Sequence, residues 1–193
     1  MKISIRLLWA FMLGVYISGP SVAQSTTSVS CDQITVGAFP RTAYWEGFTG
    51  SFDVRSNGLN FSCRYIFPLQ NNLKLVAGFG GMTFVNSFDS RSYAIGANIE
   101  LQYYFEATKN LGVYAGFDVG IIHGYDGFLD EKFMIGTLIP AGQLKAGVLF
   151  DVPDTNLTVF GGLRVIPPVS GLRGTISPTL GMTYHFGPRV TWR

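Results

Sequence analysis

The sequence predicts an all-β fold, a single eight-stranded antiparallel transmembrane β-barrel. Three observations support this prediction: an export signal at the N-terminus, segments of strand length that alternate apolar and polar side chains, and no later apolar stretch long enough for a transmembrane helix. A closed barrel pairs every backbone polar group without water, so its strands can cross a bilayer. A soluble β-sandwich is the alternative fold.

The N-terminus has the parts of a secretory signal peptide. Lys2 and Arg6 form a basic start, residues 7–17 form an apolar core, and Ser21-Val22-Ala23 is a small-residue cleavage site. A transmembrane anchor, the alternative, needs a longer apolar run. We therefore expect a chain exported to a Gram-negative outer membrane and organised as a signal peptide over 1–23, a barrel over 24–186 and a periplasmic tail over 187–193.

The composition fits a chain that faces lipid. Only 13% of the residues are charged, against about a quarter in soluble domains, while 15% are aromatic and 24 are glycine. Without Lys2 and Arg6, the 14 Lys and Arg residues fall to 12 and equal the 12 acidic residues, so the net charge falls from +2 to 0. With no basic stripe, no nucleic-acid partner is expected. The expected partners are phospholipid and lipopolysaccharide, around a monomeric barrel.

Eight strands are expected near residues 33–40, 59–69, 72–86, 91–106, 110–124, 132–151, 156–166 and 174–186. The weakest pattern is in the first, and residues 41–56 are either an outer loop or part of a longer first strand. The sixth is too long to be regular, and Pro140 is expected to break its pairing. The clearest alternation is in residues 91–105, 111–122 and 175–186, whose apolar side chains occupy every second position.

The connections between these strands alternate in length. Short turns are expected at 70–72, 108–110 and 153–155, and longer connections at 87–91, 125–132 and 167–174. Because bacterial barrels have short periplasmic turns, the longer connections are placed outside the cell. Part of a periplasmic aromatic girdle is expected from Tyr103, Tyr104, Phe105, Tyr184 and Phe186.

The last strand carries a further pattern. Thr179-x-Gly181-x-x-Tyr184-x-Phe186 resembles the C-terminal signal by which outer-membrane barrels are handed to their insertion machinery. We therefore expect that machinery to be a partner during biogenesis.

The interior of the predicted barrel is polar. The alternation directs inward Arg64, Lys74, Asn98, Glu100, Gln102, Asp118, Lys145, Arg164 and His185. Because buried charges must be paired, we expect a hydrogen-bonded plug rather than an ion path or an acid–base site. Eight strands also leave no channel. Glycines 112, 116 and 120 share this inward face and make room for bulkier partners.

The two cysteines, Cys31 and Cys63, leave two alternatives open. An exported chain permits a disulfide that ties the N-terminal segment to an early strand. The other alternative is two unrelated thiols, because Cys63 falls on the predicted lipid face.

From Leu75 to Pro168, the order of features is similar to that of the lipid A palmitoyltransferase family. The similar stretches are residues 84–88 (FVNSF), 94–96 (AIG), 111–120 (LGVYAGFDVG), 138–140 (LIP) and 165–167 (VIP). The family consists of eight-stranded outer-membrane barrels that move a palmitoyl chain from a phospholipid to lipid A. The resemblance implies lipid entry through the wall at Pro140 and Pro167, although proline is also ordinary at loop edges.

The resemblance also implies catalytic candidates. Ser87 occupies the position of the family's serine, but Asn86 replaces its aspartate, and no histidine lies between residues 24 and 122. A serine without a base is a poor nucleophile. His123, followed by Asp126 in the next loop, is the candidate replacement base. The alternative is an interfacial residue, because the phase of its strand places His123 with Val119 and Ile121 on the lipid face. The acidic residues of that loop lack calcium-loop spacing, and neither a metal nor a cofactor is expected.

Three functions follow from these expectations. The first is a palmitoyltransferase-like barrel that binds lipid and, if active, transfers an acyl chain to lipid A. The second is a non-enzymatic barrel that binds lipid or lipopolysaccharide and stiffens the envelope, and the third is a small surface barrel used in adhesion. Acyl-chain binding predicts an inward apolar pocket formed by Val76, Met82, Phe84, Tyr114, Leu149 and Phe160.

Overall fold

The structure is a computed structural model that describes residues 31–45, 53–55, 57–86, 90–124, 135, 138–167 and 174–186. The predicted signal peptide and the C-terminal tail lie outside the described residues. Among the described residues, no helix is both long and apolar enough to span a bilayer.

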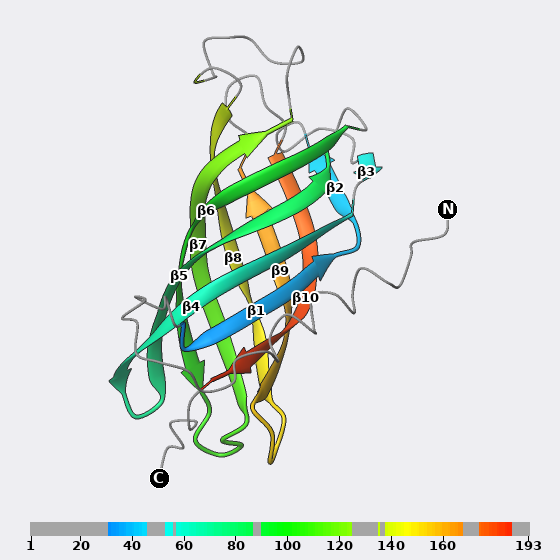
Figure 1. Ribbon diagram of the computed structural model, residues 1–193. Helices are drawn as coiled ribbons and strands as arrows, with labels where there is room; N and C mark the ends of the chain where they lie inside the picture. The colour runs from blue at the N-terminus through cyan, green and yellow to red at the C-terminus, as the bar shows by residue number, and fades with distance from the viewer. Residues whose placement is uncertain are drawn as a thin grey trace, which may run out of the picture. The chain divides into compact units, whose positions relative to one another are not determined.

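The described residues form a closed, antiparallel, eight-stranded β-barrel (Figure 1). Its staves are β1 (Gln33–Phe39), β4 (Gly58–Gln70), β5 (Leu73–Val85), β6 (Arg91–Tyr104), β7 (Leu111–His123), β8 (Leu138–Asp151), β9 (Leu157–Ile166) and β10 (Gly174–His185). Each stave pairs with the next, and β1 closes the barrel by pairing with β10 from Gln33↔His185 to Ala38↔Leu180. The predicted fold class is therefore confirmed.

Two short strands continue the first stave beyond Pro40. β2 (Thr42–Trp45) pairs with the start of β10, and β3 (Asp53–Arg55) pairs with β2. Within the region left open between an outer loop and a longer first strand, β2 therefore extends the stave along β10, and β3 pairs beside it. Residues 46–52 and 56 lie outside the described residues. Proline at the break removes one backbone donor, which explains why the stave is interrupted there.

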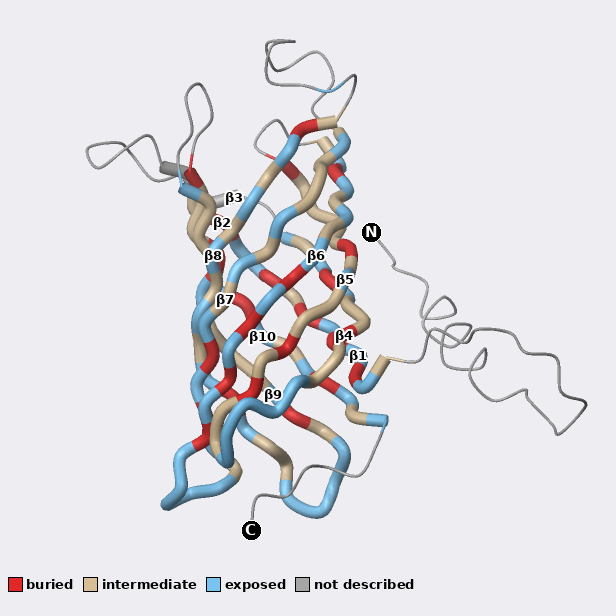
Figure 2. Tube along the Cα trace, turned by 90° about the vertical axis from the view of Figure 1, so that its left-hand side faces the viewer, coloured by how far each residue is buried: buried red, intermediate tan, exposed pale blue. Residues whose placement is uncertain are grey.

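Buried and exposed residues alternate along the staves as predicted (Figure 2). The buried positions are mostly polar, and the exposed positions on the strands include many large apolar residues. The interior-facing residues predicted from the pattern include Arg64, Glu100 and Arg164, and all three are at most 8% exposed. On the outer face, Phe61 and Ile95 are each 63% exposed. This distribution is the reverse of that in a water-soluble domain, where large apolar side chains are inside.

One member of the predicted aromatic girdle faces the other way. Tyr103 and Phe105 lie outward with their ring centroids 5.8 Å apart, and Tyr184 and Phe186 lie outward 5.2 Å apart. Tyr104 is only 4% exposed, with the Lys74 ammonium over its ring. Its inclusion in the girdle was wrong, because strand neighbours alternate faces.

The sixth stave corrects a second expectation. Pairing of β8 with β7 does not break at Pro140 but continues through Ile121↔Pro140 to His123↔Leu138. Pairing of β8 with β9 begins only at Leu144↔Val165, since β9 ends at Ile166. Of the described strands, only β7 therefore pairs with residues 138–143, and proline is tolerated at such an edge.

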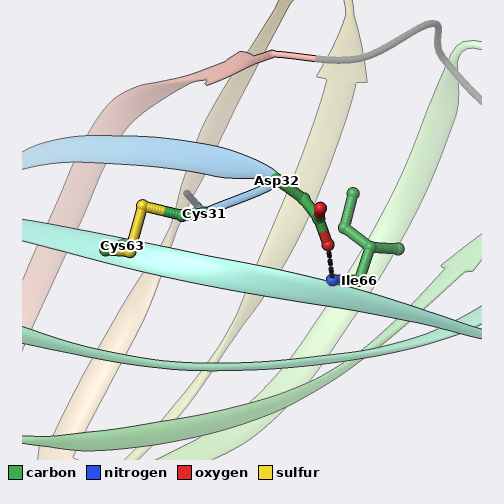
Figure 3. The surroundings of a disulfide bond; sticks show 4 residues. All are labelled: Cys31, Asp32, Cys63 and Ile66. Carbon is green, nitrogen blue, oxygen red and sulfur yellow. Dashed lines mark hydrogen bonds between the residues drawn. A yellow bond between two sulfur atoms is a disulfide. The ribbon is translucent and has the colours of Figure 1, made fainter. Parts of the chain in front are cut away.

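The two cysteines form a disulfide that joins the start of β1 to its neighbour β4 (Figure 3). Cys31 precedes β1, and Cys63 lies in β4, where it pairs in register with Ile34. The Cα atoms of the two cysteines are 5.5 Å apart. Asp32 fastens the same segment, because its Oδ2 accepts a hydrogen bond of 2.8 Å from the Ile66 N–H. Of the two alternatives for the cysteines, the disulfide is therefore the one that forms, although Cys63 faces outward.

Candidate functional site in the barrel lumen

The lumen is occupied by three successive groups of side chains. A cavity lies nearest the ends of the strands that carry the longer connections, an ion-pair network lies in the middle, and an aromatic cluster lies toward the short turns. Two of the short turns carry the left-handed residues Lys109 (φ 47°) and Asp154 (φ 57°). The lumen is therefore polar at its centre, with apolar side chains on both sides.

The ion-pair network crosses the lumen. Glu100 on β6 binds Arg64 of β4 at 2.6 Å and Lys145 of β8 at 3.2 Å, and Lys145 also binds Asp118 of β7 at 2.8 Å. Polar side chains extend it at both ends: Gln143 donates to Asp118 at 2.7 Å, and Arg64 donates to Thr35 at 3.3 Å. Since Thr35 is bonded to Thr183 of β10, the chain of contacts reaches six of the eight staves.

The aromatic cluster packs against the side of this network that faces the short turns. Tyr104, Tyr114 and Leu149 are at most 5% exposed, and Phe160 packs against them with its ring edge-on to Tyr114 at 6.2 Å. Glycine at the facing positions makes this possible, because a Cβ on Gly162 would lie 2.5 Å from the Tyr114 hydroxyl. Close to the turns, Thr158 bonds both Asp151 and His185.

The cavity has a volume of about 140 Å³. Its polar lining, toward the middle of the staves, includes Asn98, Asp118, Lys145 and Arg164. Its apolar lining, at the ends of the staves, includes Phe39, Met82, Phe84, Ile122 and Ile166. The cavity is therefore amphipathic. Its charged end is the side of the ion-pair network that faces the longer connections.

The residues predicted to form the acyl pocket lie on both sides of the ion-pair network. Met82 and Phe84 line the cavity, whereas Tyr114, Leu149 and Phe160 belong to the cluster on the other side of the charges. Val76 is fully buried and does not line the cavity. The alternation identified all six as inward-facing side chains, but it carries no information about which of them meet across the lumen.

Asn86, one of the catalytic candidates, is held in a structural turn. Its side chain is fully buried, and its amide donates to the Gly124 carbonyl at 2.7 Å and to the Ser92 hydroxyl at 3.1 Å. Its Oδ1 accepts from the Ser90 N–H at 3.1 Å. These contacts fasten the end of β5 to the end of β7, where Gly124 has the positive φ of 111° that favours glycine.

Of the other catalytic candidates, the structure describes only His123, which lies on the opposite face of the barrel wall from Asn86. His123 is exposed on the outward face of β7, where it pairs with Tyr93, whose side chain is 52% exposed. Ser87 and Asp126 lie outside the described residues. Of the proline sites, Pro140 is exposed on β8 and Pro167 is exposed just after β9.

Residues missed by the sequence reasoning complete the cavity. Phe39, Ile122 and Ile166 sit at inward positions of their strands, so their phase was readable. The signal was available but weak, because each is the last or next-to-last residue of a strand, where boundaries are least certain. Among the described residues, no group of His, Cys, Asp and Glu side chains has the arrangement of a metal site.

No protein family matches the chain, and neither does any curated protein sequence. Solved structures with a similar arrangement of strands include Ail, the attachment invasion locus protein of Yersinia pestis (14% identity, 81% of this chain and 99% of that chain, TM-score 0.46). Neisserial surface protein A is another (12% identity, 80% and 96%, TM-score 0.49). A third is a de novo designed transmembrane β-barrel (12% identity, 80% and 96%, TM-score 0.39).

Proposed function

We propose that the chain is an outer-membrane β-barrel of a Gram-negative bacterium that works without catalysis, as a structural or surface-interaction protein. The observation that carries this proposal is the inverted polarity of the barrel. Leu144, Leu163 and Leu180 on three successive staves are each more than half exposed, while the lumen holds five paired or hydrogen-bonded charges. An apolar surface of this extent in a closed barrel is suited to lipid.

The plugged lumen argues against a pore. The contacts that join Thr183, Thr35, Arg64, Glu100, Lys145, Asp118 and Gln143 cross the interior. An eight-stranded barrel has an interior that side chains nearly fill. The expected role therefore belongs to the outside of the barrel: its lipid-facing wall and its connections.

The predicted catalytic residues favour the non-enzymatic function over acyl transfer. The Asn86 amide is engaged by Gly124, Ser92 and the Ser90 N–H, which leaves it as a brace of the turn. The His123 side chain lies on the outer wall with Tyr93, on the opposite face from the lumen. A base must reach the proton that it removes, and this placement does not favour such a contact.

The proposed partners are membrane lipid and, during biogenesis, the insertion machinery. The outward rings of Tyr184 and Phe186 lie at the C-terminal end of β10, the place of the pattern that resembles an insertion signal. The protein is proposed to be a monomer, and Leu144, Leu163 and Leu180 then contact acyl chains.

Location and orientation are tested by labelling single introduced cysteines on intact cells with a membrane-impermeant maleimide. Ser170→Cys, in a predicted outer connection, is expected to react, while Asn156→Cys, in a periplasmic turn, reacts only after lysis. Both variants should sediment with the outer membrane. Recovery of the protein in a soluble fraction, or labelling of position 156 alone, would overturn the proposal.

The absence of catalysis is tested by mass spectrometry of lipid A from a palmitoyltransferase-null strain that expresses the chain. The lipid A spectrum is expected to match that of the empty-vector strain while the protein is folded in the outer membrane. A new species heavier by one acyl chain, absent from a Ser87→Ala strain, would instead establish acyl transfer through a rearranged site.

A further inference from the structure

The central charges of the lumen do not balance. Three cations, Arg64, Lys145 and Arg164, face two carboxylates, Glu100 and Asp118. Glu100 is bound by Arg64 and Lys145, and Asp118 is bound by Lys145, while none of the ion pairs among the described residues includes Arg164. Among the described residues, Arg164 is therefore a buried cation that makes no ion pair of its own.

Arg164 is held in place but is not saturated. Its side chain is 8% exposed, and its guanidinium lies 5.8 Å from the Phe39 ring centroid. With the Asn60 amide turned so that its oxygen faces the guanidinium, Asn60 accepts from Nη2 at 3.0 Å and donates to the Gly37 carbonyl at 3.1 Å. The Nε–H has no hydrogen-bond partner. A buried donor without a partner is costly, and more so on a charged group.

The unsatisfied guanidinium borders the cavity. Arg164 lines it together with Lys145 and Asn98, and its other end is lined by Phe84, Ile122 and similar apolar side chains. The volume of about 140 Å³ is close to the roughly 150 Å³ of an engineered cavity in another protein that accommodates benzene. Charge, donor geometry and size therefore describe one kind of guest, an anionic group on a small apolar body.

We propose that this cavity binds a small organic monoanion, a carboxylate on an apolar body about the size of benzoate. The carboxylate lies against the Arg164 guanidinium, whose planar fork suits two carboxylate oxygens, and neutralises the excess charge. The apolar body extends toward Phe84 and Ile122. This site is independent of whether the barrel acts as a structural or a surface-interaction protein.

Isothermal titration of the refolded full chain in detergent micelles tests the proposal, with sodium benzoate as the ligand. Saturable 1:1 binding is expected. Benzyl alcohol, which has the ring without the charge, and inorganic phosphate, which has charge without the ring, should each bind at least tenfold more weakly. The absence of saturable benzoate binding by the folded chain would overturn the proposal. Equal binding of benzyl alcohol would reduce the site to an apolar cavity, and equal binding of phosphate would reduce it to a general anion site.

Three variants locate the site. Arg164→Met removes the charge and is expected to weaken benzoate binding at least tenfold, and Arg164→Lys should recover part of the loss. Lys74→Gln removes a lumen cation that lies over the Tyr104 ring, outside the cavity. The benzoate affinity of this variant should therefore stay within twofold of that of the parent protein. Folding of each variant is checked by its heat-dependent gel mobility.

A filling variant keeps the proposal testable if Arg164→Met fails to fold. Ala94 lines the cavity from β6 without contributing charge, and Ala94→Leu is expected to displace the ligand while Arg164 remains. Unchanged affinity in Ala94→Leu, or equal losses in Arg164→Met and Lys74→Gln, would place benzoate elsewhere and contradict the assignment.

Discussion

At the scale of single residues, Glu100 is the centre of the lumen. Its carboxylate is shared by Arg64 and Lys145 and also accepts from the Gln102 amide at 2.6 Å. Removing one member of a buried ionic network leaves the remaining charges uncompensated, which costs more than the network contributes when intact. The position is therefore more sensitive to neutralisation than any exposed carboxylate.

We predict that Glu100→Gln lowers the free energy of unfolding by about 3 kcal/mol or more, because two buried cations lose their shared anion. Urea unfolding in lipid vesicles measures the change. The matched control is Glu106→Gln, at an exposed turn where the carboxylate accepts only from Asn72 among the described contacts, and its effect should stay below about 0.5 kcal/mol. Equal effects of the two substitutions would show that the network is not buried.

Two neighbouring glycines make a second comparison of single residues. A Cβ on Gly162 would meet the Tyr114 hydroxyl at 2.5 Å, whereas a Cβ on Gly161 finds its nearest neighbour at 4.0 Å. We predict that Gly162→Ala destabilises the barrel by about 1–3 kcal/mol through overpacking, and that Gly161→Ala is neutral or slightly stabilising. Urea unfolding in lipid vesicles measures both changes. A larger loss of stability for Gly161→Ala than for Gly162→Ala would contradict the inward placement of Tyr114.

At the scale of elements, the disulfide fastens the start of β1 to β4. It joins Cys31 and Cys63 across 32 positions, so its removal frees a long loop in the unfolded chain. We predict that Cys31→Ser with Cys63→Ser lowers stability by about 2–4 kcal/mol without changing the fold. The measurement is unfolding of the double variant beside the parent, and beside the parent under reducing conditions. A reduced parent as stable as the oxidised one would contradict the prediction.

The elements also show what the sequence was able to predict. The phase of every long stave was readable, because a one-residue error would have put Arg64 or Glu100 on the apolar face. The extent of pairing between β8 and β9 was not readable, since it depends on where β9 ends, and the sequence left open whether the first stave continues beyond Pro40. The separation of Met82 from Tyr114 was equally hidden, because it depends on which side chains meet across the lumen.

At the scale of the whole molecule, the feature to test is the apolar character of the outer face of the barrel. Leu144 is 59% exposed on β8 near the middle of the barrel, and Leu111 is 38% exposed at the turn end of β7. In a bilayer, arginine costs roughly 2–4 kcal/mol at the midplane and about 0–1 kcal/mol near the interface. We predict this difference between Leu144→Arg and Leu111→Arg, measured as folding free energy in phospholipid vesicles. Equal and small effects would favour a water-exposed barrel.

The seam between β1 and β10 sets the order of assembly. Thr35 and Thr183, which meet there through their hydroxyls, are 148 positions apart, so this contact closes nearly the whole described chain into a ring. The pairs between consecutive staves, by contrast, form between near neighbours in sequence and carry a much smaller loop entropy. We therefore expect the seam to be the last pairing to form. Until it closes, the sheet keeps two open edges that need protection from pairing with other chains.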